Sequence, residues 1–362
     1  MQPARKINVG LIGFGMAGQV FHAPTISAVD GLRLLKVTAR RPDQQELLAT
    51  RYPDATGVTA AEEIIHADDI DLIVIATSND VHYALAKAAL SAGKHVVVEK
   101  PFTNTSAEAD ELIALARRHN RLLSVYHNAR WNSDYLTIKK IIAGGRLGEL
   151  VSFEARYDRF RNTLKENAWR EMNLPGSGIL YDLGAHLIDQ SLQLFGIPEA
   201  INADLRMQRP GAQAVDDFEL ILHYPQLKVT LKSSMLVKEP SPRYALYGLQ
   251  GAFVKYGIDP QEAALKAGAS PLGDPEWGKE PEAIWGKLNV LEDGADHIAY
   301  VESERGDYPA FYRNVCDAVR GRAALAVTAT AARNVIRIIE LAEQSWREKR
   351  TIVLDNEKLL DC

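Results

Sequence analysis

The stretch INVGLIGFGMAG, residues 7–18, gives the clearest indication of how this chain folds. It opens with an apolar run that predicts a short buried strand over residues 6–13. Gly13-Phe14-Gly15-Met16-Ala17-Gly18 then matches GxGxxG, the pattern of a tight turn between a strand and a helix. Gly13 permits the turn, Gly15 lets the backbone approach a pyrophosphate, and Gly18 allows close helix packing. The pattern predicts a dinucleotide site, with a glycine-rich structural turn as the alternative.

More apolar runs follow in the first third of the chain, at residues 32–39, 69–77, 94–100 and 121–128. Each is too uniformly apolar for a sheet with one solvated face, so helices should cover both faces. The intervening stretches, including 80–93 and 105–120, have helical periodicity and capping residues. The alternation predicts an α/β fold that begins with a doubly wound parallel sheet, a Rossmann domain over residues 1–127.

Bulk composition narrows the function classes. A length of 362 residues favours two domains, and the net charge of -5 offers no basic field for nucleic acid. Cys316 and Cys362 form neither a disulfide framework nor a zinc-ligand pattern, which predicts a cytoplasmic protein without a metal. Glycines interrupt the apolar start of the chain, so we interpret it as folded structure and expect no membrane segment.

The end of the second predicted strand bears on the choice of cofactor. NAD-binding domains usually place a carboxylate there for the ribose 2′-hydroxyl, whereas this chain reads Val37-Thr38-Ala39-Arg40-Arg41. Thr38, Arg40 and Arg41 could hold a 2′-phosphate through charge-assisted hydrogen bonds. The sequence therefore favours NADP over NAD; the alternative is that the two arginines begin a solvated helix.

Residues 128–362 have a different pattern. A helix is predicted over 135–145, and runs such as 149–160 and 218–236 alternate polar and apolar residues, which predicts an α+β domain with an open, largely antiparallel sheet. A C-terminal helix is predicted over 326–349, and it could pack back on the first domain. The segment 261–301 contains no motif that indicates a chemical role. It could form a lid over the site or part of a dimer surface.

GILYDLGAHLID, residues 178–189, places Asp182 and His186 four residues apart on one face of a predicted helix. A solvated helix face is the simpler interpretation. The alternative is that the two side chains point into a site, together with Lys100, which follows the strand at 94–100 where open α/β sheets bind ligands.

The glycine turn, EKPF at 99–102 and GSGILYDLGAHLID at 176–189 together resemble the Gfo/Idh/MocA family of oxidoreductases. FHAP at 21–24, DRFR at 158–161 and NLPGSG at 173–178 are similar to its subgroup of NADP-dependent scyllo-inositol dehydrogenases. The resemblance implies that Lys100 lies near the nicotinamide, that Asp182 and His186 form the D-x-x-x-H pair, and that the bond before Pro101 is cis. Gly176-Ser177-Gly178 departs mildly from the family's glycine run.

These residue types suit alcohol oxidation. His186 is predicted to carry the proton, Asp182 to orient substrate or imidazole, and Lys100 to stabilise alkoxide character. Further residues are predicted to border the cofactor or to contact substrate hydroxyls. The first group comprises Thr77, Asn79, His82, Glu99, Trp169 and Arg170, and the second Asn128, Arg130, Tyr157 and Arg161.

The prediction is thus an NADP-dependent dehydrogenase acting on the CH–OH group of a cyclic polyol or sugar, with scyllo-inositol or its keto form as substrate. A dehydrogenase of another sugar, a biliverdin-like reductase and a non-catalytic NADP-binding sensor are the alternatives. We also expect a homodimer or higher homo-oligomer, because an open sheet with an apolar outer face requires cover.

Overall fold

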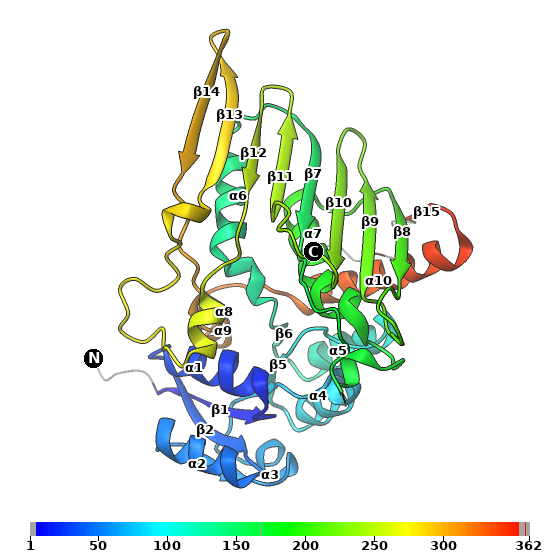
Figure 1. Cartoon of the computed structure of the whole chain (residues 1–362). Helices are drawn as coiled ribbons and strands as arrows, with labels where there is room; N and C mark the ends of the chain where they lie inside the picture. The colour runs from blue at the N-terminus through cyan, green and yellow to red at the C-terminus, as the bar shows by residue number, and fades with distance from the viewer. Residues whose placement is uncertain (1–4, 167, 355–358, 360–362) are drawn as a thin grey trace.

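The computed structural model describes residues 5–166, 168–354 and 359 (Figure 1). It contains two sheets that lie one above the other, with the N-terminal sheet below and the larger sheet above in this view. The predicted fold class, a Rossmann sheet followed by an open and mostly antiparallel sheet, is confirmed. In the described part of the chain, no helix is both long and apolar enough to cross a bilayer.

The first sheet has six parallel strands in the order β3-β2-β1-β4-β5-β6. Their bounds are Ile7–Ile12 (β1), Leu32–Thr38 (β2), Thr56–Val58 (β3), Leu72–Ile75 (β4), His95–Val98 (β5) and Leu123–Val125 (β6). The short and polar β3 had no apolar run to predict it. The strand order reverses at β1, which pairs with both β2 and β4. This switch point is where doubly wound sheets bind ligands.

Helices cover both faces of this sheet, as the uniformly apolar strands require. They include α1 (Ala23–Ser27), α2 (Pro42–Arg51), α3 (Glu62–Ile65), α4 (His82–Ser91) and α5 (Ser106–Arg118). At the start of α5, the Thr105 hydroxyl accepts a hydrogen bond from the Glu108 N–H, and the Glu108 carboxylate accepts one from the Thr105 N–H. This capping box fixes where the helix begins.

The second sheet has nine strands in the order β14-β13-β12-β11-β7-β10-β9-β8-β15. Their bounds are Leu150–Arg156 (β7), Ala200–Arg206 (β8), Asp217–His223 (β9), Lys228–Ser234 (β10), Tyr244–Gly248 (β11), Gly251–Lys255 (β12), Gly286–Glu292 (β13), Ala295–Val301 (β14) and Ile352–Val353 (β15). Only β7 and β10 pair in parallel among these described strands. The inner face packs on α6 (Ser133–Ala143), α7 (Ala185–Phe195) and α10 (Ala329–Glu348).

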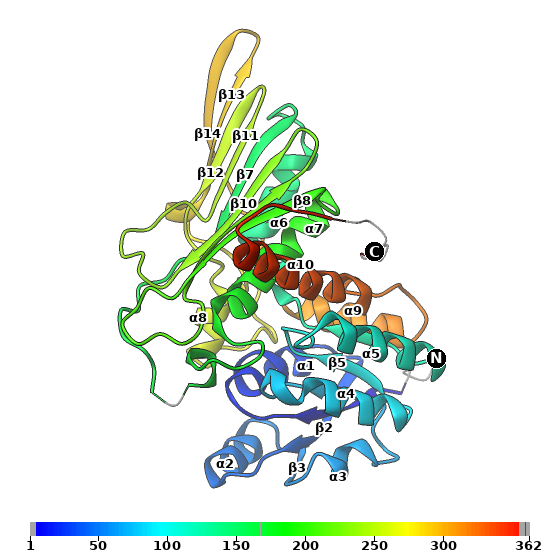
Figure 2. The same cartoon turned by 90° about the vertical axis from the view of Figure 1, so that its right-hand side faces the viewer.

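Two C-terminal helices join the two sheets (Figure 2). Phe311 and Tyr312 of α9 (Pro309–Val319) are buried in the core of the first sheet. α10 contacts both α5 and β8. Its Arg333 donates hydrogen bonds of 2.9 and 3.0 Å to Asp110 on α5, while Ile338 faces the core of the second sheet. The last third of the chain therefore completes the hydrophobic core begun by the first third.

The outer face of the second sheet differs from our expectation. It was expected to be apolar, but its central strands carry charged side chains, among them Glu219 and Lys232, which form an ion pair of 2.8 Å. Exposed apolar side chains are found toward one edge, where Ile298 and Tyr300 lie on β14. Alternation had indicated a polar face and an apolar face, and the apolar one is turned inward on the helices.

The segment 261–301 forms α8 (Gln261–Lys266), the short helix η6 (Glu282–Ile284) and the hairpin of β13 and β14. Glu280 anchors it: its carboxylate accepts a 2.5 Å hydrogen bond from Lys255 of β12, and both side chains are fully buried. Ser133 and Ser303 donate to the same carboxylate. The segment is thus an integral part of the second domain.

Candidate active site

The glycine turn after β1 has the geometry of a nucleotide site. Gly13 has φ of +102°, and a Cβ there would lie 2.5 Å from the Ala76 carbonyl oxygen. A Cβ on Gly18 would lie 2.1 Å from the Gly13 oxygen, because the π-helical turn η1 (Gly18–His22) packs directly against the loop. A Cβ on Gly15 would meet no protein atom within 4 Å. The protein itself requires glycine at two positions, and at Gly15 it leaves open backbone that fits a closely approaching pyrophosphate.

The neighbouring residues of the turn divide between core and cleft. Phe14 is buried, and its carbonyl accepts hydrogen bonds from Gln19 and Gln44. Met16 and Ala17 line the cleft described below. The turn thus places Phe14 in the core and the two residues after Gly15 on the cleft.

The end of β2 supplies the residues predicted for a 2′-phosphate. The Thr38 hydroxyl accepts a 2.7 Å hydrogen bond from the Gly13 N–H, which ties β2 to the glycine turn. Arg40 donates to the Thr59 carbonyl, and Arg41 donates two 3.0 Å hydrogen bonds to Asp43. Both arginines are exposed. They lie beside the turn, as a 2′-phosphate would require, although Asp43 is closer to one of them than the sequence suggested.

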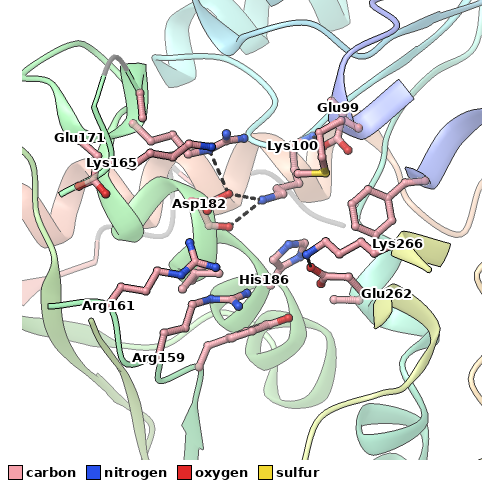
Figure 3. A pocket seen from close by; sticks show the side chains of 18 of the residues that line it. Glu99, Lys100, Arg159, Arg161, Lys165, Glu171, Asp182, His186, Glu262 and Lys266 are labelled. Atoms are coloured by element: carbon pink, nitrogen blue, oxygen red, sulfur yellow. Dashed lines mark hydrogen bonds and ion pairs between the residues drawn. The ribbon is translucent and has the colours of Figure 1, made fainter. Parts of the chain in front are cut away.

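A cleft of about 910 Å³ opens at the carboxyl edge of the first sheet, between it and the second sheet (Figure 3). The predicted site residues that line it are Met16, Ala17, Thr77, Glu99, Lys100, Asn128, Tyr157, Arg161, Trp169, Arg170, Asp182 and His186. They come from six separate parts of the chain: the glycine turn, the end of β4, the end of β5, the η3 turn (Asn128–Trp131), the loop after β7, and the segment 182–186. The structure thus brings most of the predicted site together.

Lys100 and Asp182 form an ion pair in the cleft. The Lys100 Nζ donates hydrogen bonds to the Asp182 carboxylate at 2.7 Å and to its carbonyl at 2.9 Å. Arg170 Nε lies 3.5 Å from the same carboxylate. Burial opposes ionisation of Asp182, but these two cations outweigh it and lower the pKa of the carboxyl group below its ordinary value. Asp182 therefore carries a negative charge at neutral pH.

His186 lies at the start of α7, directly after the π-helical turn η5 (Leu180–Gly184) that contains Asp182. Its side chain is buried at the floor of the cleft, 6.4 Å from the Tyr157 ring between centroids. Burial, together with the charge of Lys100, holds the pKa of His186 well below its ordinary value. The imidazole is therefore neutral at pH 7 and able to accept a proton.

Two residues predicted to border the cofactor support the cleft from behind. The His82 ring nitrogens lie 3.0 Å from the Pro101 carbonyl and 3.3 Å from the Thr77 carbonyl, and burial lowers the pKa of His82. Asn79 is buried and donates to the Gly176 carbonyl at 3.1 Å. These side chains hold the ends of β4 and β5 in place. The Lys100–Pro101 bond is cis, as the resemblance implies.

Arg130 requires a correction, because the structure does not bring it to the cleft. Its guanidinium donates to both oxygens of Asp189, at 2.8 and 2.6 Å, and to the Ala326 carbonyl at 2.6 Å. Both charged groups are buried. A buried guanidinium requires fixed partners, so Arg130 serves to join η3 to α7. Asp189, the third polar residue of the stretch 178–189, is thus occupied by Arg130.

Several residues of the cleft were missed from the sequence: Arg159, Lys165, Glu262 and Lys266 line it. His22 lies outside that lining as a structural residue; it is fully buried, with Nε2 3.3 Å from the Glu99 carboxylate and Nδ1 2.5 Å from the Tyr312 hydroxyl. The DRFR motif had drawn attention to Arg161 but not to its neighbour Arg159, and α8 lies in the segment that showed no pattern. No group of three or more His, Cys, Asp or Glu in the described residues is placed to hold a metal ion.

Comparison with known proteins gives matches over both parts of the chain. Residues 7–127 match a family model described as oxidoreductase family, NAD-binding Rossmann fold, and residues 139–354 match the model of the family's C-terminal alpha/beta domain. The uncharacterized oxidoreductase YdgJ of Escherichia coli is 44% identical over 349 residues, which cover 96% of this chain and 99% of YdgJ.

Other relatives have described activities or solved structures. The scyllo-inositol 2-dehydrogenase (NADP(+)) IolW of Bacillus subtilis is 41% identical over 350 residues, covering 97% of this chain and 96% of IolW. Levoglucosan dehydrogenase of Pseudarthrobacter phenanthrenivorans is 32% identical over 229 residues, covering 58% of each protein. The solved structure of the oxidoreductase yvaA from B. subtilis has a TM-score of 0.94 at 40% identity, covering 98% of this chain and 100% of yvaA.

Proposed function

The chain belongs to the Gfo/Idh/MocA family of oxidoreductases, and from this premise we propose that it is an NADP-dependent dehydrogenase of a cyclic polyol or sugar. The reaction is hydride transfer between the nicotinamide and a secondary alcohol or ketone, with scyllo-inositol and its keto form as first candidates. One observation carries the proposal: Lys100, Asp182 and His186, from distant parts of the chain, meet in one cleft at the carboxyl edge of the Rossmann sheet.

The residues around the glycine turn fit the cofactor. The open backbone at Gly15 would take the pyrophosphate, and Arg40 and Arg41 would take the 2′-phosphate of NADP. When bound, the nicotinamide supplies the acceptor or donor of the hydride. The relative IolW is an NADP(+)-dependent dehydrogenase, which supports the same choice for this chain. We place the boundary between cofactor and substrate domains at residue 127.

The protein groups divide the remaining chemistry. Neutral His186 takes the hydroxyl proton during oxidation and returns it during reduction. The Lys100 ammonium stabilises negative charge on the reacting oxygen, and ionised Asp182 holds that ammonium in place through the 2.7 Å hydrogen bond. Trp169 and Arg170 border the same space and would limit access of water.

The substrate proposal is supported by IolW, which is a scyllo-inositol 2-dehydrogenase. A dehydrogenase of another sugar is the second candidate, since the more distant relative named above acts on levoglucosan. A non-catalytic NADP sensor is disfavoured because Lys100, Asp182 and His186 are all present and all line the same cleft.

The test is turnover measured by absorbance of the reduced nicotinamide, with a panel of inositols and sugars and with NADP and NAD in parallel. We expect NADP-dependent turnover that His186→Ala reduces by about 10²–10⁴-fold, the usual contribution of a general acid or base, while NADP still binds. His223→Ala, which alters a histidine outside the cleft, is the matched control. Cofactor binding without turnover of any polyol or ketose would favour the sensor.

We also propose a homodimer that works in the cytoplasm. The support is the exposed apolar side chains of β11, β13 and β14, including Tyr247, Leu291 and Tyr300. Sedimentation of only a monomer would contradict the dimer.

A further inference from the structure

One wall of the cleft is basic. Arg159, Arg161 and Lys165 line it, and all three follow β7 in the chain. In Figure 3 the two guanidiniums reach into the space beside Asp182 and His186. Within the described residues, no carboxylate lies at ion-pair distance from any of the three.

The acidic side chains of the cleft are already engaged. Each has a partner in the protein: Lys100 for Asp182 (2.7 Å), Arg209 for Glu171 (2.7 Å), Lys266 for Glu262, and the Lys100 N–H for Glu99 (2.6 Å). The positive charge of the basic wall is therefore not neutralised by the carboxylates that share the cleft with it.

The backbone of this wall is held in a defined position. The Arg159 N–H donates to the Ser234 carbonyl at 2.9 Å, and the Arg161 N–H donates to the Met235 carbonyl at 2.8 Å. In extended backbone, residues two apart point to the same side, and Arg159 and Arg161 both line the cleft. The Arg159 guanidinium also lies over the Tyr157 ring, at 5.3 Å from its centroid.

The proposed cofactor leaves these cations available. Its pyrophosphate is assigned to the turn around Gly15 and its 2′-phosphate to Arg40 and Arg41, all in the first domain. Arg159 and Arg161 belong instead to the second domain and flank the space beside His186, where the reacting carbon of a substrate would lie.

We propose that Arg159, Arg161 and Lys165 form a subsite for an anionic substituent of the substrate, a phosphate monoester or a carboxylate. This rests on the proposed dehydrogenase function and specifies its substrate class: a polyol or sugar that carries an acid group beyond the carbon that exchanges hydride. Two guanidiniums on one side of an extended segment suit such a group, because each can donate two hydrogen bonds to its oxygens.

The first experiment compares matched substrates with the whole enzyme and NADP. The pairs are myo-inositol with myo-inositol 1-phosphate, and glucose with glucose 6-phosphate and glucuronate, so that the phosphate and carboxylate arms are separate. We expect kcat/KM to be at least about tenfold higher for the acidic member of a pair, from hydrogen bonds between ions. That advantage should shrink as ionic strength rises.

Variants connect the effect to the wall. Arg159→Gln and Arg161→Gln should each lower the acidic-to-neutral ratio of kcat/KM by about tenfold, and Arg159→Lys should restore part of it. Arg33→Gln, which removes an exposed charge of β2 outside the cleft, should leave the ratio unchanged. Thermal unfolding of each variant identifies any that fail to fold. Equal kcat/KM for acidic and neutral substrates in the native enzyme would overturn the proposal.

Binding separates this proposal from the proposed function. Calorimetric titration with myo-inositol 1-phosphate in the presence of NADP does not require turnover. Binding that weakens about tenfold in Arg159→Gln but not in Arg33→Gln supports the subsite even if no substrate is oxidised, and in that case only the proposed activity fails. Binding that is equal in both variants, or undetectable in the native protein, refutes the subsite.

Discussion

Replacement of Lys100 by methionine should raise the pKa of His186 and move the acid limb of the pH–rate profile upward. In the native structure the lysine charge lowers the pKa of His186 and also neutralises Asp182 through a 2.7 Å hydrogen bond. Lys100→Met removes the repulsion and leaves the Asp182 charge one helical turn from the imidazole. Both changes favour the protonated form of His186.

The magnitude follows from the separation of the two groups. Side chains four residues apart on a helix lie about 6 Å apart, and at an effective dielectric constant of about 20 a unit charge at that distance is worth about 2.8 kcal/mol, or about two pKa units. The Asp182 side chain is 31% exposed, so solvent screens part of this. We therefore expect a rise of about one pKa unit.

The assay is kcat/KM for alcohol oxidation as a function of pH. Because the neutral imidazole is the active form, activity falls as pH drops through the pKa of His186 in the free enzyme. The native enzyme should keep its activity below pH 6.5, whereas the acid limb of Lys100→Met should lie about one pH unit higher. The plateau of kcat/KM in Lys100→Met should be lower by about 10²–10³-fold, because the charge that stabilises the reacting oxygen is lost. Lys140→Met, which removes a lysine paired with Glu304 outside the cleft, is the control. An acid limb that stays in place or moves down refutes the electrostatic coupling.

Three further predictions concern the turn, the cofactor and the second domain. Gly15→Ala should leave the unfolding temperature unchanged but weaken NADP binding by at least about tenfold. Gly18→Ala should instead destabilise the fold by about 1–3 kcal/mol, because its Cβ would meet the backbone at 2.1 Å. Calorimetric titration with NADP measures the first effect and thermal unfolding the second. Replacing Arg40 and Arg41 together by serine should raise KM for NADP about ten- to hundredfold with little change for NAD, and equal effects on both cofactors would argue against a 2′-phosphate site. Glu280→Gln should lower the free energy of unfolding by about 3–5 kcal/mol in denaturant titrations, because it breaks a fully buried ion pair; a change below about 1 kcal/mol would contradict this.

The sequence predicts those features that depend on local chemistry. The roles of Gly13 and Gly18 follow from backbone sterics within one turn, and the sequence pattern predicts both. The strands of the first sheet likewise follow from uniform apolar runs. Their order confirms a doubly wound sheet.

The sequence does not predict features that depend on a distant partner. The sequence around Arg130 is the same whether its guanidinium binds a ligand or a carboxylate of the protein. Only the fold places Asp189, 59 residues away, against it. His22 gives no sign of its contact with Glu99, and Tyr312 lies 290 residues further along the chain. The polar outer face of the second sheet was missed because alternation identifies two faces without saying which is turned outward.

The placement of α9 and α10 has a consequence for biosynthesis. The strands of the first sheet emerge from the ribosome long before the aromatic side chains that fill their core, Phe311 and Tyr312, are synthesised. At ordinary elongation rates that delay is roughly 10–40 s. Throughout that interval the nascent first domain has an incomplete interior, so it is exposed to chaperones and proteases until α9 has been synthesised.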